Sequence, residues 1–285
     1  MTPRRTTALA LSVLLAACNF PGTPTASPSA TLAPSPIPLP PRATASETPA
    51  LPPTLTPLPP RLPLPDETIL ILEPGPGSRV TSPVHVAGFA DPTFEQNLVI
   101  RLVLDDGTQL TLLPTTIQAD VGNRGPFDVD VPFTVAGEQR VSIQVYASSA
   151  RDGGITHLAS VGVTLAAGGA PEIAPAAPHP EQLVIFQPAL GETISGGLVH
   201  VEGYGRASFE GTLVVEVYDA DGNQVGSQSL IVDAPEAGAG QPGPFSVDVP
   251  YTVTVEGPGR IVVVDPLPAF NGLGHITSVE VTLRP

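Results

Sequence analysis

Hydrophobic and polar residues alternate along much of the chain after residue 65, with the period of two that is typical of half-buried β-strands. The clearest run is 127–135, where Phe or Val alternates with Asp, Pro or Thr. Pro132 places this strand at a sheet edge or a bulge, because proline cannot donate a ladder hydrogen bond. No segment longer than one turn has a helical pattern, so we expect an all-β protein.

Seven strands are predicted in the first part of this region, at 68–72, 84–89, 97–104, 108–113, 127–135, 139–147 and 158–165. Asp-Gly sequences predict hairpin turns at Asp105-Asp106-Gly107 and, further on, at Asp219-Ala220-Asp221-Gly222. Seven short strands in about 100 residues, with frequent turns, favour an immunoglobulin-like β-sandwich.

The same module occurs twice. Val-His-Val-Ala-Gly-Phe at 84–89 returns as Val-His-Val-Glu-Gly-Tyr at 199–204, and Gly-Pro-Phe begins a matching stretch at 125 and again at 243. Such self-similarity is the signature of a repeat architecture. We therefore expect two tandem immunoglobulin-like sandwiches, at 66–166 and 182–285, joined by an Ala-, Gly- and Pro-rich linker at 167–181.

The order of these motifs resembles the Gmad2 family, described as an immunoglobulin-like domain of bacterial spore-germination and related exported proteins. Phe94-Glu95 and Phe209-Glu210-Gly211 match the family's Phe-Glu-Gly, although Gln96 replaces the glycine in the first copy. A Ser-x-x-Asp-Gly pattern of the family fits 149–153, whereas the second copy has only Asn271-Gly272 there. The resemblance implies the sandwich fold and a germination-related or other surface role, with no assigned chemistry.

The first residues have the pattern of an export signal: Arg4 and Arg5, then an apolar run at 8–17. This run is about ten residues long, and a membrane-spanning helix needs roughly 20. Leu15, Ala16, Ala17 and Cys18 resemble the lipobox of bacterial lipoproteins. The resemblance implies a signal peptide at 1–17, cleavage before Cys18 and a lipid on that cysteine; the alternative is a plain secretory signal.

Residues 18–65 are predicted to be a disordered linker. Residues 19–65 contain 16 Pro and 11 Ser or Thr, and their hydrophobic residues have no period. Such a segment buries too little surface to offset the entropy of ordering it and favours extended polyproline II. We interpret it as a stalk that carries the domains away from the membrane; the alternative is a tolerated disordered tail.

Composition excludes several chemistries. The net charge is −15 and the sequence contains no lysine, which removes Walker-A, pyridoxal and protein-kinase sites. The acidic balance argues against nucleic-acid binding. A single cysteine cannot form an internal disulfide or a thiolate zinc site. Because no hydrolase motif is present, we expect no catalytic residues and no enzyme activity, and we also expect no cofactor and no resident metal.

Two groups of residues could still form sites. His85 pairs with His200 between the copies, and His157 with His275; a metal site would need carboxylates near them, such as Glu95 or Glu210. We favour structural histidines, since duplication alone explains the pairing. The Asp-Gly segments are interpreted as hairpin turns rather than calcium loops, because the rest of a calcium loop is missing.

The residues Phe94, Glu95, Phe209, Glu210 and Gly211 are the most distinctive of the module. We expect a structural role, in which the phenylalanines close one end of the core and the glutamates accept hydrogen bonds from loop N–H groups. A ligand site is the alternative.

Together these features predict a non-catalytic extracytoplasmic lipoprotein, anchored to the bacterial cell membrane by its lipid. Its tandem domains would bind an envelope protein or organise the envelope. The alternatives are a module that binds the cell wall or carbohydrate, for which Tyr204 is the aromatic to test, and a passive spacer.

Overall fold

The computed structural model describes residues 63–234, 240–268 and 272–285. The predicted signal peptide, Cys18 and nearly all of the predicted stalk lie outside this part. The described residues form β-strands and one short 3₁₀ turn, η1 (Phe94–Gln96), with no α-helix among them. Within the same residues, no helix has the length and apolar character needed to cross a membrane.

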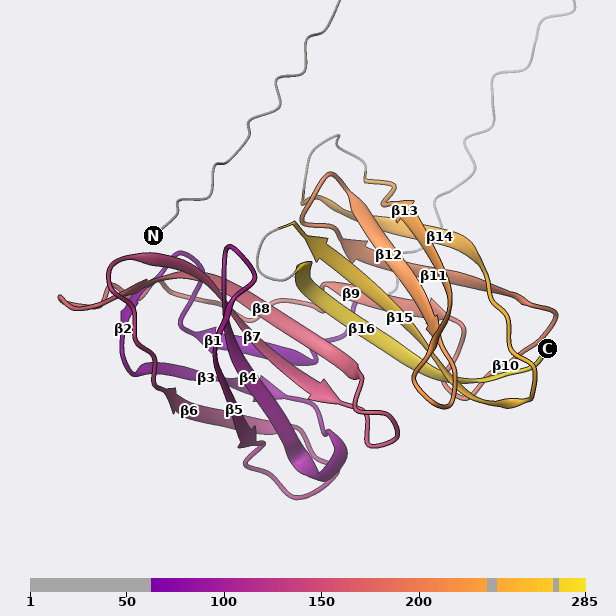
Figure 1. Ribbon diagram of the computed structural model, residues 1–285, viewed down its shortest axis with the longest axis horizontal. Helices are drawn as coiled ribbons and strands as arrows, with labels where there is room; N and C mark the ends of the chain where they lie inside the picture. Colours follow the sequence, from indigo (N-terminus) through magenta and orange to yellow (C-terminus); the bar gives the residue numbers. More distant parts are fainter. Residues whose placement is uncertain (1–62, 235–239, 269–271) are drawn as a thin grey trace, which may run out of the picture. The chain divides into compact units, whose positions relative to one another are not determined.

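The first domain is a sandwich of two sheets (Figure 1). One sheet has the strand order β1-β3-β6. The other layer, β8-β7-β4-β5 with β2 parallel to β8, is one half of a ten-stranded sheet that continues into the second domain from β8 to β16. The strands are β1 (Ile69–Glu73), β2 (Arg79–Thr81), β3 (Val84–Ala90), β4 (Asn97–Leu104), β5 (Gln109–Thr116), β6 (Gly125–Val131), β7 (Gln139–Ser148) and β8 (Ile155–Ala166).

The second domain repeats this topology strand for strand. Its separate sheet has the order β14-β11-β9, and its half of the ten-stranded sheet has the order β16-β15-β12-β13, with β10 parallel to β16. The strands are β9 (Leu183–Gln187), β10 (Thr193–Ile194), β11 (Leu198–Arg206), β12 (Thr212–Tyr218), β13 (Gln224–Ile231), β14 (Pro242–Pro250), β15 (Gly257–Leu267) and β16 (Gly272–Leu283). The predicted all-β tandem sandwich is therefore confirmed.

Alternation of burial along the strands creates one core in each domain. Every second residue of β3 is buried, and the residues between them are exposed or partly buried. The buried residues are Val84, Val86, Gly88 and Ala90. The core of the first domain contains these valines and other buried hydrophobic residues, among them Phe127. The corresponding core of the second domain contains Phe245.

The glycine of the repeated Val-x-Val-x-Gly motif is fixed by close packing. A Cβ on Gly88 would lie 1.9 Å from the Leu70 carbonyl oxygen and 2.9 Å from Cζ of Phe127. Gly203 is equally confined, by the Val184 carbonyl oxygen and the Phe245 ring. In each domain, the glycine of Val-x-Val-x-Gly therefore packs directly against the phenylalanine of Gly-Pro-Phe.

Two details differ from the sequence-based expectation. The strand predicted at 127–135 ends at Val131, because Pro132 cannot continue the ladder; the Phe133 N–H donates to Ser82 Oγ instead. The strand does lie at a sheet edge, paired only with β3 in the described structure. The short strand β2 was not predicted, since three residues carry too little pattern.

Candidate functional site

The two domains meet along β8 and β16, which pair antiparallel with Leu158 opposite Ile276. These residues occupy equivalent positions in the repeat. Ser160 Oγ donates to the Gly274 carbonyl oxygen at 2.6 Å, and its counterpart Ser278 Oγ donates to the Thr156 carbonyl oxygen at 2.7 Å. Each copy thus makes the same contact to the other, as in the isologous interface of a two-fold dimer.

An apolar cluster lies at this interface and draws on both domains. Its buried members are Leu158, Val262, Val264 and Ile276. The partly buried residues packed against it are Tyr146, Ile155, Val214, Tyr218 and Leu273. Because apolar burial is the main favourable term in association, this cluster gives the two domains a shared core.

The Ser-x-x-Asp-Gly loop of the first copy reaches the second domain. Asp152 forms a two-pronged ion pair with Arg260, with both nitrogen–oxygen distances at 3.0 Å and both side chains 2% exposed. Burial alone would raise the pKa of the Asp152 carboxyl, but hydrogen bonds from the Gly154 N–H and the Arg260 guanidinium lower it to about 2. The Ser-x-x-Asp-Gly sequence, which the second copy does not repeat, therefore fastens the two domains together.

Glu67 and Glu181 precede the first strand of each domain and exchange hydrogen bonds. The Gln182 N–H donates to Glu67 Oε2 at 3.0 Å, and the Thr68 N–H donates to Glu181 Oε2 at 2.9 Å. Each carboxylate therefore accepts the N–H of the residue that follows the other glutamate. Both glutamates are buried.

His157 and His275 join these carboxylates in one buried cluster, to which each domain and the linker region contribute. His275 Nε2 lies 2.8 Å from Glu181 Oε1 and 3.4 Å from Glu67 Oε1. His157 Nε2 lies 3.6 Å from Glu181 Oε2 and 3.8 Å from Glu67 Oε1. The two rings are nearly perpendicular, with their centroids 5.1 Å apart.

His275 and Glu181 each favour the charged form of the other. Burial alone lowers the pKa of His275, but the hydrogen bond to Glu181 and the charges of Glu67 and Glu181 outweigh it and raise that pKa. Burial raises the pKa of Glu181, and the His275 hydrogen bond and the two imidazoles more than reverse this effect. Three buried atoms of the cluster have no hydrogen-bond partner among the described residues: Glu67 Oε1, His157 Nε2 and His275 Nδ1.

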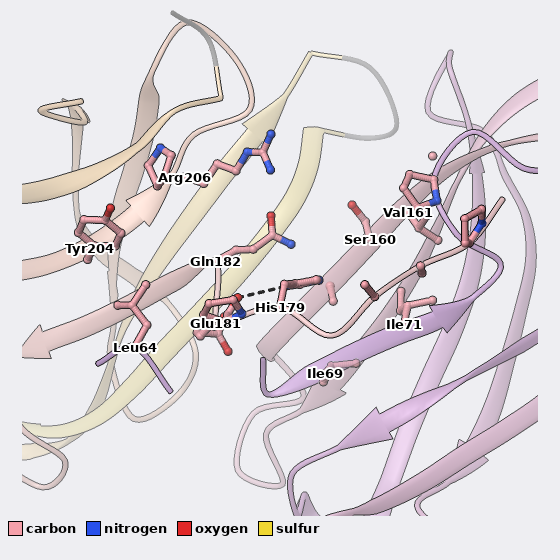
Figure 2. Close-up of a pocket in the computed structure, with 18 residues that line it drawn as sticks. Leu64, Ile69, Ile71, Ser160, Val161, His179, Glu181, Gln182, Tyr204 and Arg206 are labelled. Carbon is pink, nitrogen blue, oxygen red and sulfur yellow. Dashed lines mark hydrogen bonds between the residues drawn. The ribbon is translucent and has the colours of Figure 1, made fainter. Parts of the chain in front are cut away.

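A cavity of about 570 Å³ adjoins the cluster, and Figure 2 shows its lining. Glu181 belongs to both the cavity wall and the cluster. His179, on the linker, also lines the cavity; its Nδ1 contacts the Pro180 carbonyl oxygen and lies 3.5 Å from Glu67 Oε2. The other walls come from both domains, including Ile69, Ser160, Tyr204 and Arg206.

The phenylalanines of the family motif do not close the core, and that expectation was wrong. Phe94 is 59% exposed and Phe209 is 44% exposed. The motif acts instead through its backbone, because Glu95, Glu210 and Gly211 all have positive φ. Within the described residues, neither glutamate side chain has a hydrogen bond to a loop N–H, so the second half of the expectation was also wrong.

Gln96 shows how the first copy does without the motif's glycine. Its backbone has a φ of 57°, in the left-handed region that favours glycine. Its side chain is buried, and the amide Nε2 donates to the carbonyl oxygens of Ala119, Asp120 and Asn123. These hydrogen bonds offset the strain and tie the turn to the neighbouring loop.

His85 and His200 lie on exposed sheet faces, away from the buried cluster. His85 Nδ1 lies 3.1 Å from Asp130, and His200 Nδ1 lies 2.6 Å from Asp248. Ser246 Oγ lies 3.4 Å from His200 Nε2. Ser246, His200 and Asp248 thus lie in the order of a serine-hydrolase triad. However, Glu202 contacts that Nε2 at 3.0 Å and raises the pKa of His200, which opposes a role as general base.

The aspartate-rich segments form the predicted turns. Gly107 and Gly222 have φ values of 83° and 80° in the β4–β5 and β12–β13 hairpins. The Asp219 carboxylate accepts the N–H groups of Asp221 and Asn223, so its oxygens are used within the turn. Tyr204 is buried, which removes it as an exposed platform for sugars.

The sequence predicts one half of the buried cluster. The repeat pairs His157 with His275, but the carboxylates expected near them, Glu95 and Glu210, are not the ones that the structure brings there. The structure brings Glu67 and Glu181 instead, which occupy equivalent positions of the repeat just before β1 and β9. Comparison of the two copies at those positions would have found them.

The fold and its interface define a class of protein: a tandem pair of immunoglobulin-like sandwiches that share a buried contact. The model of the Gmad2 family, the immunoglobulin-like domain of bacterial spore germination, matches residues 68–154 and 182–267. These matches cover more than half of the chain, and the chain belongs to the Gmad2 family. No curated protein is similar enough to the chain to count as a match.

Three of the solved structures that the chain resembles are distant in sequence. A transglutaminase of red sea bream is 9% identical over 76% of this chain and 31% of its own, with a TM-score of 0.25. The titin domains Z1Z2 in complex with telethonin are 17% identical over 78% and 98% of the chains, with a TM-score of 0.18. Dimeric latent PorU from Porphyromonas gingivalis is 10% identical over 76% and 24%, with a TM-score of 0.21. The chain spans about a third of the transglutaminase, and TM-scores this low carry no argument.

Proposed function

We propose that this protein is a lipid-anchored component of the bacterial cell envelope whose tandem domains bind another envelope protein without catalysing a reaction. The observation that carries the proposal is the interface between the domains. A passive spacer needs only a chain of independent modules, whereas here β8 and β16, the apolar cluster and the Asp152–Arg260 pair join them. A joined pair presents its surfaces in a fixed relation, which favours a partner that contacts both domains.

The membrane anchor in this proposal rests on the sequence alone, on the lipobox that ends at Cys18. Labelling of growing cells with a radioactive fatty acid tests it. The full-length protein is expected to take up label and fractionate with membranes, and Cys18→Ser is expected to do neither. Release of the unlabelled wild-type protein into the medium would show a plain secretory signal instead.

Binding of a protein partner is tested by crosslinking in living cells, followed by mass spectrometry of what the full-length protein captures. The matched control is a chain that keeps the signal and stalk but lacks 66–285. A reproducible protein partner that the control does not capture supports the proposal. Capture of peptidoglycan fragments alone, or of nothing beyond the control, contradicts it and favours wall attachment or spacing.

A germination-related role enters the proposal through the description of the family. If the source bacterium forms spores, deletion of the gene should slow germination, and the wild-type gene should restore it. Germination at the normal rate in the deletion strain would remove this part of the proposal while leaving the binding role in place.

A further inference from the structure

The buried cluster at the interface has the donor set of a transition-metal site. Glu67, His157, Glu181 and His275 each offer one ligand atom, and these four atoms lie within 4.8 Å of one another. All four residues are buried. Imidazole and carboxylate groups together are ligands of Zn²⁺ and related divalent ions, and four of them suit the tetrahedral geometry of Zn²⁺.

The donor atoms lie near the separations expected around one ion. Ligands placed about 2.0–2.2 Å from Zn²⁺ at the corners of a tetrahedron are about 3.3–3.6 Å apart. The histidine–glutamate distances in the cluster are 2.8, 3.4, 3.6 and 3.8 Å. The two distances to Glu181 involve different oxygens of its carboxylate, and the four ligand atoms lie within 4.8 Å of one another. The side chains would therefore move closer together to contact one ion.

The hydrogen bonding of the cluster points to a ligand. Glu67 Oε1 and His157 Nε2 are buried and have no hydrogen-bond partner among the described residues, and the side chain of Glu67 is 0% exposed. A buried carboxylate oxygen without a partner is costly. A divalent cation would give both atoms a partner and would balance the charges of the two buried carboxylates.

We propose that Glu67, His157, Glu181 and His275 bind one divalent transition-metal ion, for which Zn²⁺ fits best, and that this ion links the two immunoglobulin-like domains. Each domain's repeat supplies one histidine, and the equivalent glutamates come from the segments just before β1 and β9. The site therefore exists only where the two domains meet, and it goes beyond the proposed binding function.

An entry route is present beside the cluster. The cavity of about 570 Å³ reaches Glu181, and His179 stands in its wall with 42% of its side chain exposed (Figure 2). An ion that enters the cavity would meet His179 and Glu181 before it reaches the more deeply buried Glu67. A site without such a route would have to bind its metal during folding.

The test uses the full-length protein, purified in detergent without a histidine tag and stripped of metal with a chelator. Zn²⁺ is then added, and bound zinc is measured by calorimetric titration and, after dialysis, by mass spectrometry. We expect one Zn²⁺ per chain, and a rise in Tm of about 5 °C or more at a hundredfold excess over Kd. Co²⁺ in place of Zn²⁺ should give the strong visible absorption of a tetrahedral site.

The variants Glu67→Gln and His157→Gln should each weaken Zn²⁺ binding more than about 10-fold, since even partners outside the ligand set cost that much. Glu95→Gln and His85→Gln are the matched controls, because they change the same residue types at positions outside the cluster. His200→Gln tests whether the exposed group of His200, Glu202 and Asp248 is the zinc site instead.

Three results would overturn the proposal. The folded wild-type protein retains no Zn²⁺; Glu67→Gln and His157→Gln bind it as tightly as the wild type; or His200→Gln alone abolishes binding. If a cluster variant does not fold, the stoichiometry and the Co²⁺ spectrum of the wild-type protein decide, and an octahedral spectrum contradicts the site. A functional partner found by crosslinking leaves this result unaffected, so the two proposals fail separately.

Discussion

At the scale of single residues, the two copies are alike in the packing around one glycine and differ at the Phe-Glu-Gly turn. Gly88 and Gly203 are confined by a backbone carbonyl and a phenylalanine ring in each copy. At the Phe-Glu-Gly turn the copies diverge, because Gly211 supplies the positive φ directly, whereas Gln96 adopts it with the help of three carbonyl contacts. In both domains the motif therefore forms a turn with positive φ.

Replacing Gly88 with alanine should destabilise the protein by about 2–3 kcal/mol, because the new methyl group overlaps the Leu70 carbonyl oxygen and the core must shift. Urea denaturation followed by circular dichroism measures the change. Gly162→Ala is the matched control, since nothing lies within 4 Å of a Cβ at that position on β8. A Gly88→Ala protein as stable as Gly162→Ala would contradict the packing described here.

The pKa of His200 should be above its usual value of 6.5, because hydrogen bonds to Glu202 and Asp248 favour the charged imidazole. The stability that this group contributes is present below pH 6.5 and is lost as the pH rises through the raised pKa. Proton NMR titration of the ring checks the value. Glu202→Gln and Asp248→Asn should each lower the His200 pKa, and no change in either variant would refute the assignment.

At the scale of elements, the period-two pattern predicted seven of the eight strands of the first domain and both Asp-Gly hairpins. The pattern succeeded because each sheet has one face in a core, so hydrophobicity marks burial. It failed at β2, which is three residues long, and at the end of β6, where Pro132 ends a pattern that continues to Val135. The first failure reflects the shortness of the strand, and the second reflects backbone hydrogen bonding, which alternation does not encode.

The site could be predicted only in part. The repeat revealed the pairs of histidines, but no spacing along the chain connects Glu67 with His157 or Glu181 with His275. Those contacts depend on β8 lying beside β16, and the contact surface arises from apolar residues that a single domain would expose. The alternation of hydrophobic residues predicts that such residues are buried, but it does not predict which domain covers them.

The loop that carries Asp152 is the element that fastens the domains, and Asp152→Ala should cost about 3 kcal/mol or more, because it leaves a buried guanidinium without its main partner. The pKa of Asp152 is about 2 rather than 3.8, so its contribution is present above pH 3.8 and is lost as the pH falls towards 2. Chemical denaturation at several pH values measures both effects.

A double-mutant cycle with Arg260→Met isolates this pair from other changes. The exposed pair of Arg140 and Asp105, 3.6 Å apart, is the matched control, and Asp105→Ala should change stability by less than about 1 kcal/mol. Equal effects of Asp152→Ala and Asp105→Ala would mean that the loop does not secure the interface.

At the scale of the whole molecule, duplication explains how the interface arose. Two copies of one sandwich place equivalent strands, serines, glutamates and histidines against each other, so the contact has the form of a two-fold dimer within one chain. The Ser-x-x-Asp-Gly sequence that carries Asp152 breaks this symmetry, because the second copy does not repeat it. The equivalent residues of the two copies form the buried cluster. The Asp152–Arg260 ion pair, which has no counterpart in the repeat, adds a further contact between the domains.

The two domains are expected to fold and act as one unit, and differential scanning calorimetry of the full-length protein tests this. We expect one unfolding transition in which the calorimetric enthalpy equals the van't Hoff enthalpy. Two separate transitions, or a single peak whose calorimetric enthalpy is about twice the van't Hoff value, would show two independent domains and contradict the claim.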